Sequence, residues 1–125
     1  MTRYLADTHI AIWLLDAPEK LNEAQRRVLA SDTQVFLSMA SMWEMAIKAS
    51  LGKLNPPLLM AETFRENGFD ILQIQQPHVE LLKVMPFVDD HRDPFDRMLI
   101  AQSMVEGLTL LSSDRRFTEY QVSVV

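Results

Sequence analysis

Residues 91–101 read HRDPFDRMLIA, a polar segment that passes directly into an apolar one. An aspartate followed by a proline and then by helix formers is typical of a helix start, with Asp93 at the N-cap and Pro94 at the first helical position. Asp96 then falls in the first turn of a helix that runs to Glu106. The pattern therefore predicts two carboxylates at one helix N-terminus.

The two acids differ in how well a purely structural role explains them. Asp93 is best interpreted as the N-cap itself, accepting a backbone N–H. The helix dipole also favours an acid at the position of Asp96. Three further acids, however, follow segments that a parallel sheet would bring beside Asp96, namely Asp7, Glu44 and Asp114. This convergence favours a functional role for Asp96.

Short apolar segments alternate with helical patterns along the whole chain. The expected strands are residues 4–6, 34–38, 70–74, 109–111 and 121–125. The expected helices are residues 9–15, 22–30, 41–51, 58–67, 77–85 and 94–106. Such alternation predicts an α/β protein with a central, mostly parallel sheet and helices on both faces. We therefore expect a three-layer α/β/α fold.

The composition is that of one globular domain covering residues 1–125, long enough to bury about two-thirds of its unfolded surface. The absence of cysteine excludes disulfides, thiolate catalysis and cysteine-ligated zinc. No apolar run approaches the roughly 20 residues of a membrane span, so we expect a cytoplasmic protein that does not enter the membrane. The net charge of -5 argues against nonspecific attraction of the whole surface to nucleic acid.

Asp7 and Asp114 both come after short apolar segments that are expected to be buried strands. Asp7 directly follows residues 4–6, and Thr8 is better placed than Asp7 to cap the next helix. Asp114 follows residues 109–111 after two serines. Ligands of parallel α/β sheets bind outside the carboxyl ends of the strands. Both acids are therefore expected in a functional site at this edge of the sheet.

Glu44 has two interpretations. Ser41 and Glu44 have the spacing of a capping box, in which the glutamate bonds back to the backbone at the helix start. The sequence around Glu44, considered by itself, favours this structural role over a functional one. Glu44 also lies one turn into the helix that follows the second strand, where it is able to point toward the same edge as Asp7. Lys48, four residues later, is its expected ion-pair partner.

Other polar residues are given structural interpretations. His78 is interpreted as an exposed residue in the first turn of its helix. The helix at residues 94–106 is apolar almost all round, with Gln102 and Glu106 as its main polar side.

An acidic cluster requires a cation. Two carboxylates about 5 Å apart repel each other by roughly 3 kcal/mol at an effective dielectric constant near 20. Hard oxygen ligands select Mg²⁺ or Mn²⁺ over zinc. Such an ion lowers the pKa of a bound water and neutralises charge on a phosphodiester under attack. The expected reaction is therefore phosphodiester hydrolysis.

Four segments together resemble the PIN-domain ribonucleases, especially the VapC-type toxins of bacterial toxin-antitoxin pairs. They are LADTH at residues 5–9, SMWE at 41–44, HRDPFDRMLIAQ at 91–102 and SSDRRF at 112–117. Each motif is short, but the four in this order are fairly specific. The resemblance implies a five-stranded parallel sheet, divalent-metal-dependent cleavage of single-stranded RNA, a homodimer and a small antitoxin that blocks the site.

The resemblance also implies roles for individual residues. Asp7, Glu44, Asp96 and Asp114 form the acidic catalytic set. Asp7 and Asp96 are the direct metal ligands, and Asp114 and Glu44 are further possible ligands. Supporting positions are Asp93, which belongs to the Asp-Pro-Phe-Asp form of one branch of the family, and Ser112, where many members carry threonine.

Four arginines flank these acids, namely Arg92, Arg97, Arg115 and Arg116. Surface arginine in contact with solvent is the default interpretation. In the functional interpretation they bind RNA phosphates and offset the acidic overall charge.

Two other classes of function remain open. A non-catalytic PIN-like module would bind RNA or protein and keep the acids for architecture. An α/β phosphatase also has an aspartate at a strand end, but a haloacid-dehalogenase-type enzyme requires a second aspartate two places after Asp7, where this chain has His9.

Overall fold

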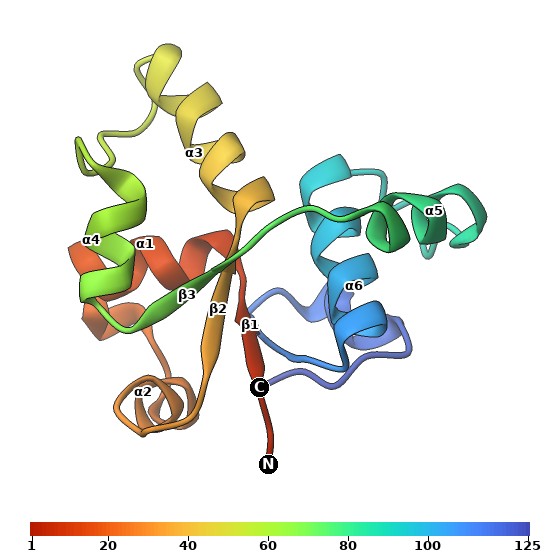
Figure 1. The fold of residues 1–125 in the computed structure, drawn as a ribbon, viewed down its shortest axis with the longest axis horizontal. Coiled ribbons are helices and arrows are strands. Elements are labelled where there is room, and N and C mark those ends of the chain that lie inside the picture. Colours follow the sequence, from red (N-terminus) through yellow and green to blue (C-terminus); the bar gives the residue numbers. More distant parts are fainter.

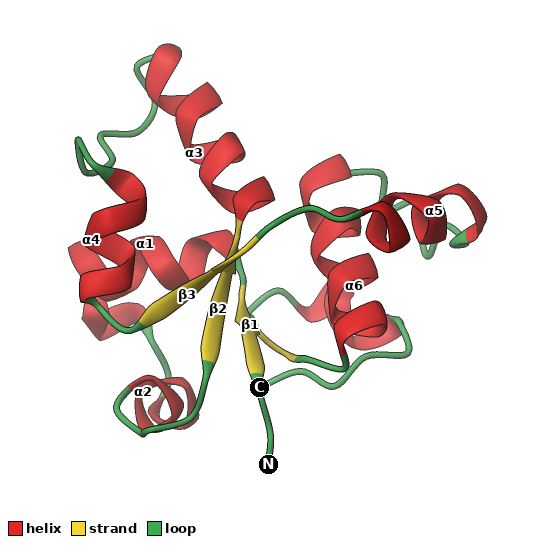
Figure 2. Ribbon diagram, in the orientation of Figure 1, coloured by secondary structure: helices red, strands yellow, loops and turns green.

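The computed structural model describes residues 1–125, which form one parallel sheet with helices on both sides (Figures 1 and 2). The strands are β1 (Tyr4–Ala6), β2 (Val35–Ser38), β3 (Phe69–Leu72) and β4 (Thr109–Leu111). The α-helices are α1 (Thr8–Asp16), α2 (Glu23–Leu29), α3 (Met39–Ser50), α4 (Met60–Glu66), α5 (Gln76–Val84) and α6 (Pro94–Glu106). Two 3-10 helices, η1 (Pro18–Lys20) and η2 (Arg115–Glu119), complete the fold.

Neighbouring residues of each strand contribute to cores on opposite faces of the sheet. In β1, Leu5 packs in one core with residues of α6, and Ala6 packs in the other with residues of α1, α3 and α4. In β4, Leu110 packs in the same core as Leu5, and Leu111 packs in the same core as Ala6. A strand whose two faces are both buried needs apolar residues at successive positions, as these short segments have. The structure confirms the expected three-layer α/β/α fold.

The order of the strands creates a switch point between β1 and β4. The order in the sheet is β3-β2-β1-β4, so the chain moves outward from β1 to β3 and then returns to β4 on the other side of β1. Ala6 and Leu111 are paired at the ends of their strands. Asp7 N donates to Leu111 O at 2.9 Å. Residues that follow β1 and β4 are therefore held side by side, at the position where such sheets bind ligands.

Helix α6 has the bounds predicted for it. Asp93 is its N-cap, and the Oδ1 atom accepts hydrogen bonds from Phe95 N and Asp96 N, both at 2.9 Å. Gly107 ends the helix with φ at 68°, in the left-handed region that glycine adopts most easily. The capping prediction for Asp93 is confirmed.

The fifth expected strand, at residues 121–125, is not a strand in the structure. Only Val124 forms a bridge, to Leu110 of β4. The preceding residues form η2 and bury Phe117 and Tyr120 against the sheet. Only residues 123–125 therefore form backbone hydrogen bonds beside β4. The sheet has four strands.

Helix α3 begins two residues earlier than predicted. Ser38 is its N-cap, with Oγ accepting from Ala40 N at 3.0 Å. Ser41 lies inside the helix, where its Oγ accepts a hydrogen bond from Thr8 Oγ1 at 2.9 Å. The capping-box interpretation of Glu44 is therefore wrong.

His78 and Gln102 are fully buried, and for His78 this corrects the expected exposed position. His78 Nδ1 accepts from Gln75 N at 2.9 Å, and His78 Nε2 bonds to Glu106 Oε2 at 2.8 Å. Gln102 Nε2 donates to Gln73 O at 3.3 Å. Both ring nitrogens of His78 are bonded, whereas Gln102 is bonded through its Nε2 atom only and its Oε1 atom is buried without a partner. None of the helices combines the length and apolarity needed to cross a bilayer.

Candidate active site

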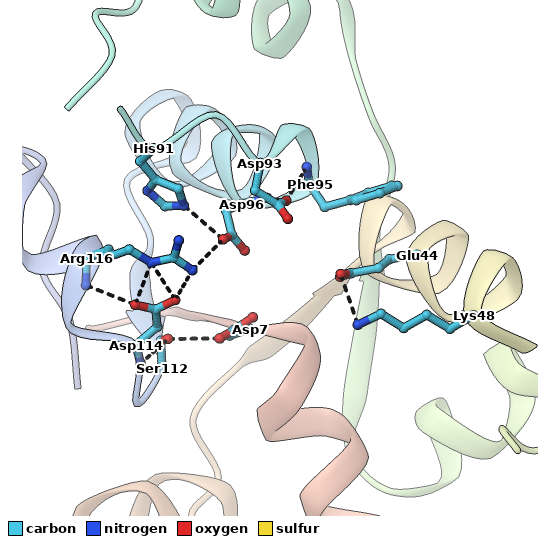
Figure 3. A network of polar contacts seen from close by, with 10 residues as sticks. All are labelled: Asp7, Glu44, Lys48, His91, Asp93, Phe95, Asp96, Ser112, Asp114 and Arg116. Atoms are coloured by element: carbon cyan, nitrogen blue, oxygen red, sulfur yellow. Dashed lines mark hydrogen bonds and ion pairs between the residues drawn. The ribbon is translucent and has the colours of Figure 1, made fainter. Parts of the chain in front are cut away.

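Four acids from distant parts of the chain gather beyond the carboxyl end of the sheet, as Figure 3 shows. Asp7 follows β1, and Asp114 follows β4. Asp96 lies in the first turn of α6, and Glu44 lies in α3. A cavity of about 250 Å³ opens beside two of them and is lined by Asp7, His9, Trp13, Ser113 and Asp114.

Asp7 is a buried carboxylate that faces the site rather than its own helix. It occupies the N-cap position of α1, but its side chain makes no capping hydrogen bond. The Oδ2 atom instead accepts from Ser112 Oγ at 2.9 Å. Burial raises the pKa of Asp7, and the hydrogen bond from Ser112 opposes this shift. Thr8, the expected cap, is the first helical residue and bonds to Ser41.

Ser112 connects two of the acids through one hydroxyl. Its Oγ donates to Asp7 Oδ2 at 2.9 Å and accepts from Asp114 N at 3.0 Å. The side chain therefore fixes the orientation of the Asp7 carboxylate relative to the turn after β4. Ser112 therefore contacts both acids, and its supporting role in the reaction stays a prediction.

Asp96 is held by a residue to which the sequence analysis gave no role. His91 Nε2 bonds to Asp96 Oδ2 at 2.9 Å, and His91 is only 3% exposed. The His91 ring packs against Phe117 and Tyr120. Burial raises the pKa of Asp96 to about 6, although the hydrogen bond to His91 opposes the shift. The one available signal for His91 was its place five residues before Asp96, ahead of the helix.

Asp114 is neutralised by an arginine of the chain itself. Arg116 Nη2 lies 2.7 Å from Asp114 Oδ2, and Arg116 Nε donates to Asp114 Oδ1 at 3.1 Å. These bonds from Arg116 hold the pKa of Asp114 below its usual range. Arg116 Nη2 is also 3.6 Å from Asp96 Oδ2. One guanidinium thus bridges two acids of the site.

Glu44 stands at the side of the site formed by α3. Its Oε2 atom is 3.3 Å from Lys48 Nζ, which confirms the expected ion pair. Burial is the main cause of the raised pKa of Asp7, and the charge of Glu44 makes a smaller contribution in the same direction. Glu44 therefore interacts electrostatically with Asp7 without bonding to it.

The four arginines do not all face the acids. Arg97 is buried, and its Nη1 and Nη2 atoms donate to Pro86 O at 3.1 Å and Met85 O at 2.8 Å. One residue along a helix turns by about 100°, so Arg97 points away from the side occupied by Asp96. The phosphate-binding prediction for Arg97 is therefore wrong.

The other three arginines are exposed. Arg92 pairs with Asp90 through Nε at 2.6 Å, and Arg116 pairs with the acids described above. Arg115 forms no ion pair. All three side chains are exposed, but of the three only Arg115 is free of an ion pair.

The donors of the site fit a hard divalent cation in kind. All four are carboxylates, and burial raises the pKa of Asp7 and of Asp96, so a cation among them would offset an unfavourable charge. No three His, Asp or Glu side chains are close enough together to hold a metal ion, and Arg116 contacts two of the acids. A complete ion site thus requires some rearrangement of these side chains.

An apolar groove of about 480 Å³ lies between α3 and α4. Its lining includes Trp43, Leu58 and Leu59, which are 60%, 97% and 63% exposed. Such a concentration of exposed large apolar side chains is typical of a protein-binding surface.

Comparison with known proteins gives a consistent result over the whole chain. The family model of the PIN domain matches residues 4–122. Ribonuclease VapC22 of Mycobacterium tuberculosis is 26% identical over 128 residues, which cover 97% of this chain and 94% of the relative.

Several solved structures share the fold. DNA-bound VapBC from Salmonella typhimurium aligns with a TM-score of 0.69 at 17% identity, covering 100% of this chain and 98% of that one. VapBC2 from Rickettsia felis, bound to a DNA fragment from its promoter, gives 0.66 at 11% identity, covering 99% and 98%. FitAcB from Neisseria gonorrhoeae gives 0.65 at 20% identity, covering 97% and 95%. The similarity extends over nearly the full length of each chain.

Proposed function

The chain belongs to the PIN domain family, and on this premise we propose that it is a divalent-metal-dependent endoribonuclease that cleaves single-stranded RNA. The observation that carries the proposal is the convergence of Asp7, Asp96 and Asp114 at the switch point between β1 and β4. Two of these acids are buried enough to have raised pKa values, which is common at functional sites. The similarity to ribonuclease VapC22 supports the same reaction.

In this proposal Asp7 and Asp96 ligate Mg²⁺ or Mn²⁺, with Asp114 and Glu44 as further ligands. The bound ion would supply a water of lowered pKa and positive charge beside the phosphodiester. The chain's own groups orient the ligands. Ser112 donates to Asp7 Oδ2 and His91 bonds to Asp96 Oδ2, so one oxygen of each carboxylate is held and the other remains available.

The exposed arginines Arg92, Arg115 and Arg116 are the proposed contacts to RNA phosphates. A protein of net charge -5 needs a local concentration of positive charge to bind a polyanion. Arg97 is excluded from this set because its guanidinium bonds to two backbone carbonyls.

We further propose that residues 1–125 act in the cytoplasm as one domain, a homodimeric toxin inhibited by a small antitoxin. The VapBC and FitAcB complexes of similar fold support such a partner. The groove between α3 and α4 is the surface proposed for the antitoxin. Leu58→Ser with Leu59→Ser should weaken copurification with a coexpressed cognate antitoxin, whereas Val79→Ser on α5 should not. Equal copurification of all variants would exclude this groove.

A non-catalytic binding module remains the second candidate because Arg116 already neutralises Asp114 and contacts Asp96. An RNA cleavage assay with titrated Mg²⁺ or Mn²⁺ separates the two candidates. The nuclease should cleave only with the ion and stop on chelation, and Asp7→Asn should abolish cleavage. Glu23→Gln, which removes an exposed acid of α2 that pairs with Arg27, is the matched control. RNA binding without cleavage at any ion concentration would favour the binding module, and hydrolysis of a small phosphomonoester would instead indicate a phosphatase.

A further inference from the structure

Arg116 is the one cationic side chain that contacts two acids of the proposed metal site. We propose that its guanidinium is an internal counter-ion, which holds Asp96 and Asp114 when no metal ion is bound and releases them when an ion binds. This inference rests on the proposed function and adds to it a residue that sets the affinity for the ion.

The guanidinium occupies both oxygens of Asp114, which an incoming ion would need in order to bind this residue, and it lies beside Asp96. Two of its nitrogens bond to Asp114 at 2.7 Å and 3.1 Å, in the forked arrangement that suits arginine and a carboxylate. The same Nη2 atom is 3.6 Å from Asp96 Oδ2. The guanidinium and a divalent ion therefore compete directly for the oxygens of Asp114, and both would offset the negative charge of Asp96.

The contacts also allow the side chain to leave without disturbing the backbone. The Arg116 side chain is 58% exposed, so it is able to move into solvent. The backbone N of Arg116 donates separately to Asp114 Oδ1 at 3.0 Å, and Asp114 N is held by Ser112 Oγ at 3.0 Å. The turn that presents Asp114 would keep these bonds after the guanidinium has left.

Electrostatics favours the exchange over binding of both cations. A divalent ion and a guanidinium at the same two acids repel each other, and the ion carries the larger charge. Release leaves the guanidinium near the site and free for a phosphate oxygen. The counter-ion thus lowers the affinity for the ion and stabilises the acids in its absence.

Arg115 provides a matched control within the same short helix. It is the neighbouring residue, it is exposed, and it forms no ion pair with Asp96 or Asp114. Arg115→Gln and Arg116→Gln change the net charge equally. Any difference in ion affinity between the two variants therefore reports the direct contacts of Arg116.

Calorimetric titration of the full chain with Mn²⁺ tests the proposal. Arg116→Gln should bind Mn²⁺ about fivefold more tightly than the wild type, the order expected for a lost contact of a half-exposed charged side chain. Arg115→Gln should differ from the wild type by less than about twofold because it loses only a distant charge. Arg116→Lys, which keeps the charge and loses the fork, should fall between the wild type and Arg116→Gln. Circular dichroism checks that each variant is folded.

A second readout follows the side chain itself. The Arg116 Nε–H signal in a ¹⁵N spectrum, assigned by its loss in Arg116→Gln, should shift and exchange faster with water as Mg²⁺ saturates the site. The buried Arg97 Nε–H signal should not move. An unmoved Arg116 signal at saturation, or an Arg116→Gln affinity no tighter than that of Arg115→Gln, would overturn the inference and leave the proposed nuclease intact. Absence of ion binding in the wild type would overturn both.

Discussion

The molecule contains two buried histidines that each bond to a carboxylate, and they differ in what surrounds them. His78 uses both ring nitrogens, one with Gln75 N and the other with Glu106. His91 bonds to Asp96 through Nε2, while its Nδ1 is buried without a hydrogen-bond partner in the protein. Glu106 ends α6, whereas Asp96 begins it.

The difference separates a structural pair from a functional one. The pair of His78 and Glu106 ties α5 to α6, and both ring nitrogens of His78 have fixed partners. The carboxylate of Asp96 is shared between His91 and Arg116 and is repelled by Asp93 and Asp7. A carboxylate with competing partners and a pKa raised to about 6 by burial is a better candidate for chemistry than one with a single fixed partner.

The largest expected effect is a loss of RNA cleavage when the charge of Asp96 is removed. Asp96→Asn should lower RNA cleavage by about a thousandfold or more because an amide is a poor ligand for the ion. Glu106→Gln, the matched change in the other pair, should leave cleavage within about twofold because the amide oxygen still accepts from His78. The initial rates of RNA cleavage by the two folded variants are compared. Equal losses of rate would show that Asp96 and Glu106 do not differ in function.

The second-largest expected effect is a loss of folding stability when the pair of His78 and Glu106 is broken. His78→Ala leaves a cavity and unpaired polar groups between α5 and α6, so we expect a loss of about 3 kcal/mol of unfolding free energy. Urea denaturation measures it. The cleavage rate per folded molecule should stay near that of the wild type, and a proportionate loss of rate would show that His78 also supports the site.

His91→Ala should have a smaller effect on cleavage than the loss of Asp96. Removal of a residue that orients a metal ligand lowers activity or ion affinity by about 10- to 100-fold. His91→Gln keeps an N–H donor and should recover part of the loss. If glutamine and alanine behave alike, and only the melting temperature falls, His91 has a packing role alone.

The raised pKa of Asp96 also predicts how stability depends on pH. Burial raises this pKa to about 6, so the folded state binds a proton more tightly than the unfolded state does. The contribution of Asp96 is favourable below its unfolded pKa and is lost as pH rises through about 6. Asp96→Asn should therefore be at least as stable as the wild type at pH 8 without added ion, with this advantage disappearing near pH 4. Urea denaturation at both pH values without divalent ions tests the sign, and a deficit of Asp96→Asn at pH 8 would contradict it.

The smallest expected effect comes from the cap of α6. Asp93→Asn keeps an acceptor for Phe95 N and Asp96 N, so the loss of stability should be about a few tenths to 1 kcal/mol. Thermal unfolding measures it. A collapse of cleavage at an unchanged melting temperature would instead give Asp93 a role in the reaction.

Features with local signals were predictable from the sequence. Helix α6 was predicted with its observed bounds because a cap, a proline and a glycine each act within one helical turn. The fold class followed from the alternation of short apolar segments and helices. Asp7 and Asp114 were expected side by side because both follow strands of one parallel sheet, and the structure has them there.

Features that depend on packing were not predictable in the same way. The partners of His78 and His91 come from residues that approach only in the folded chain, so their burial has no local signature. Arg97 sits beside Asp96 in sequence, yet the helix turns it toward Met85 O. The fifth expected strand is reduced to a bridge because η2 occupies the chain up to Glu119, so that only residues 123–125 bond beside β4.

Binding of Mn²⁺ to Asp7→Asn, Asp96→Asn and Glu106→Gln, followed by electron paramagnetic resonance, tests most directly whether the gathered acids form an ion site. We predict that the wild type and Glu106→Gln bind the ion, and that Asp7→Asn and Asp96→Asn lose it while remaining folded. Equal binding by all four proteins would contradict the account.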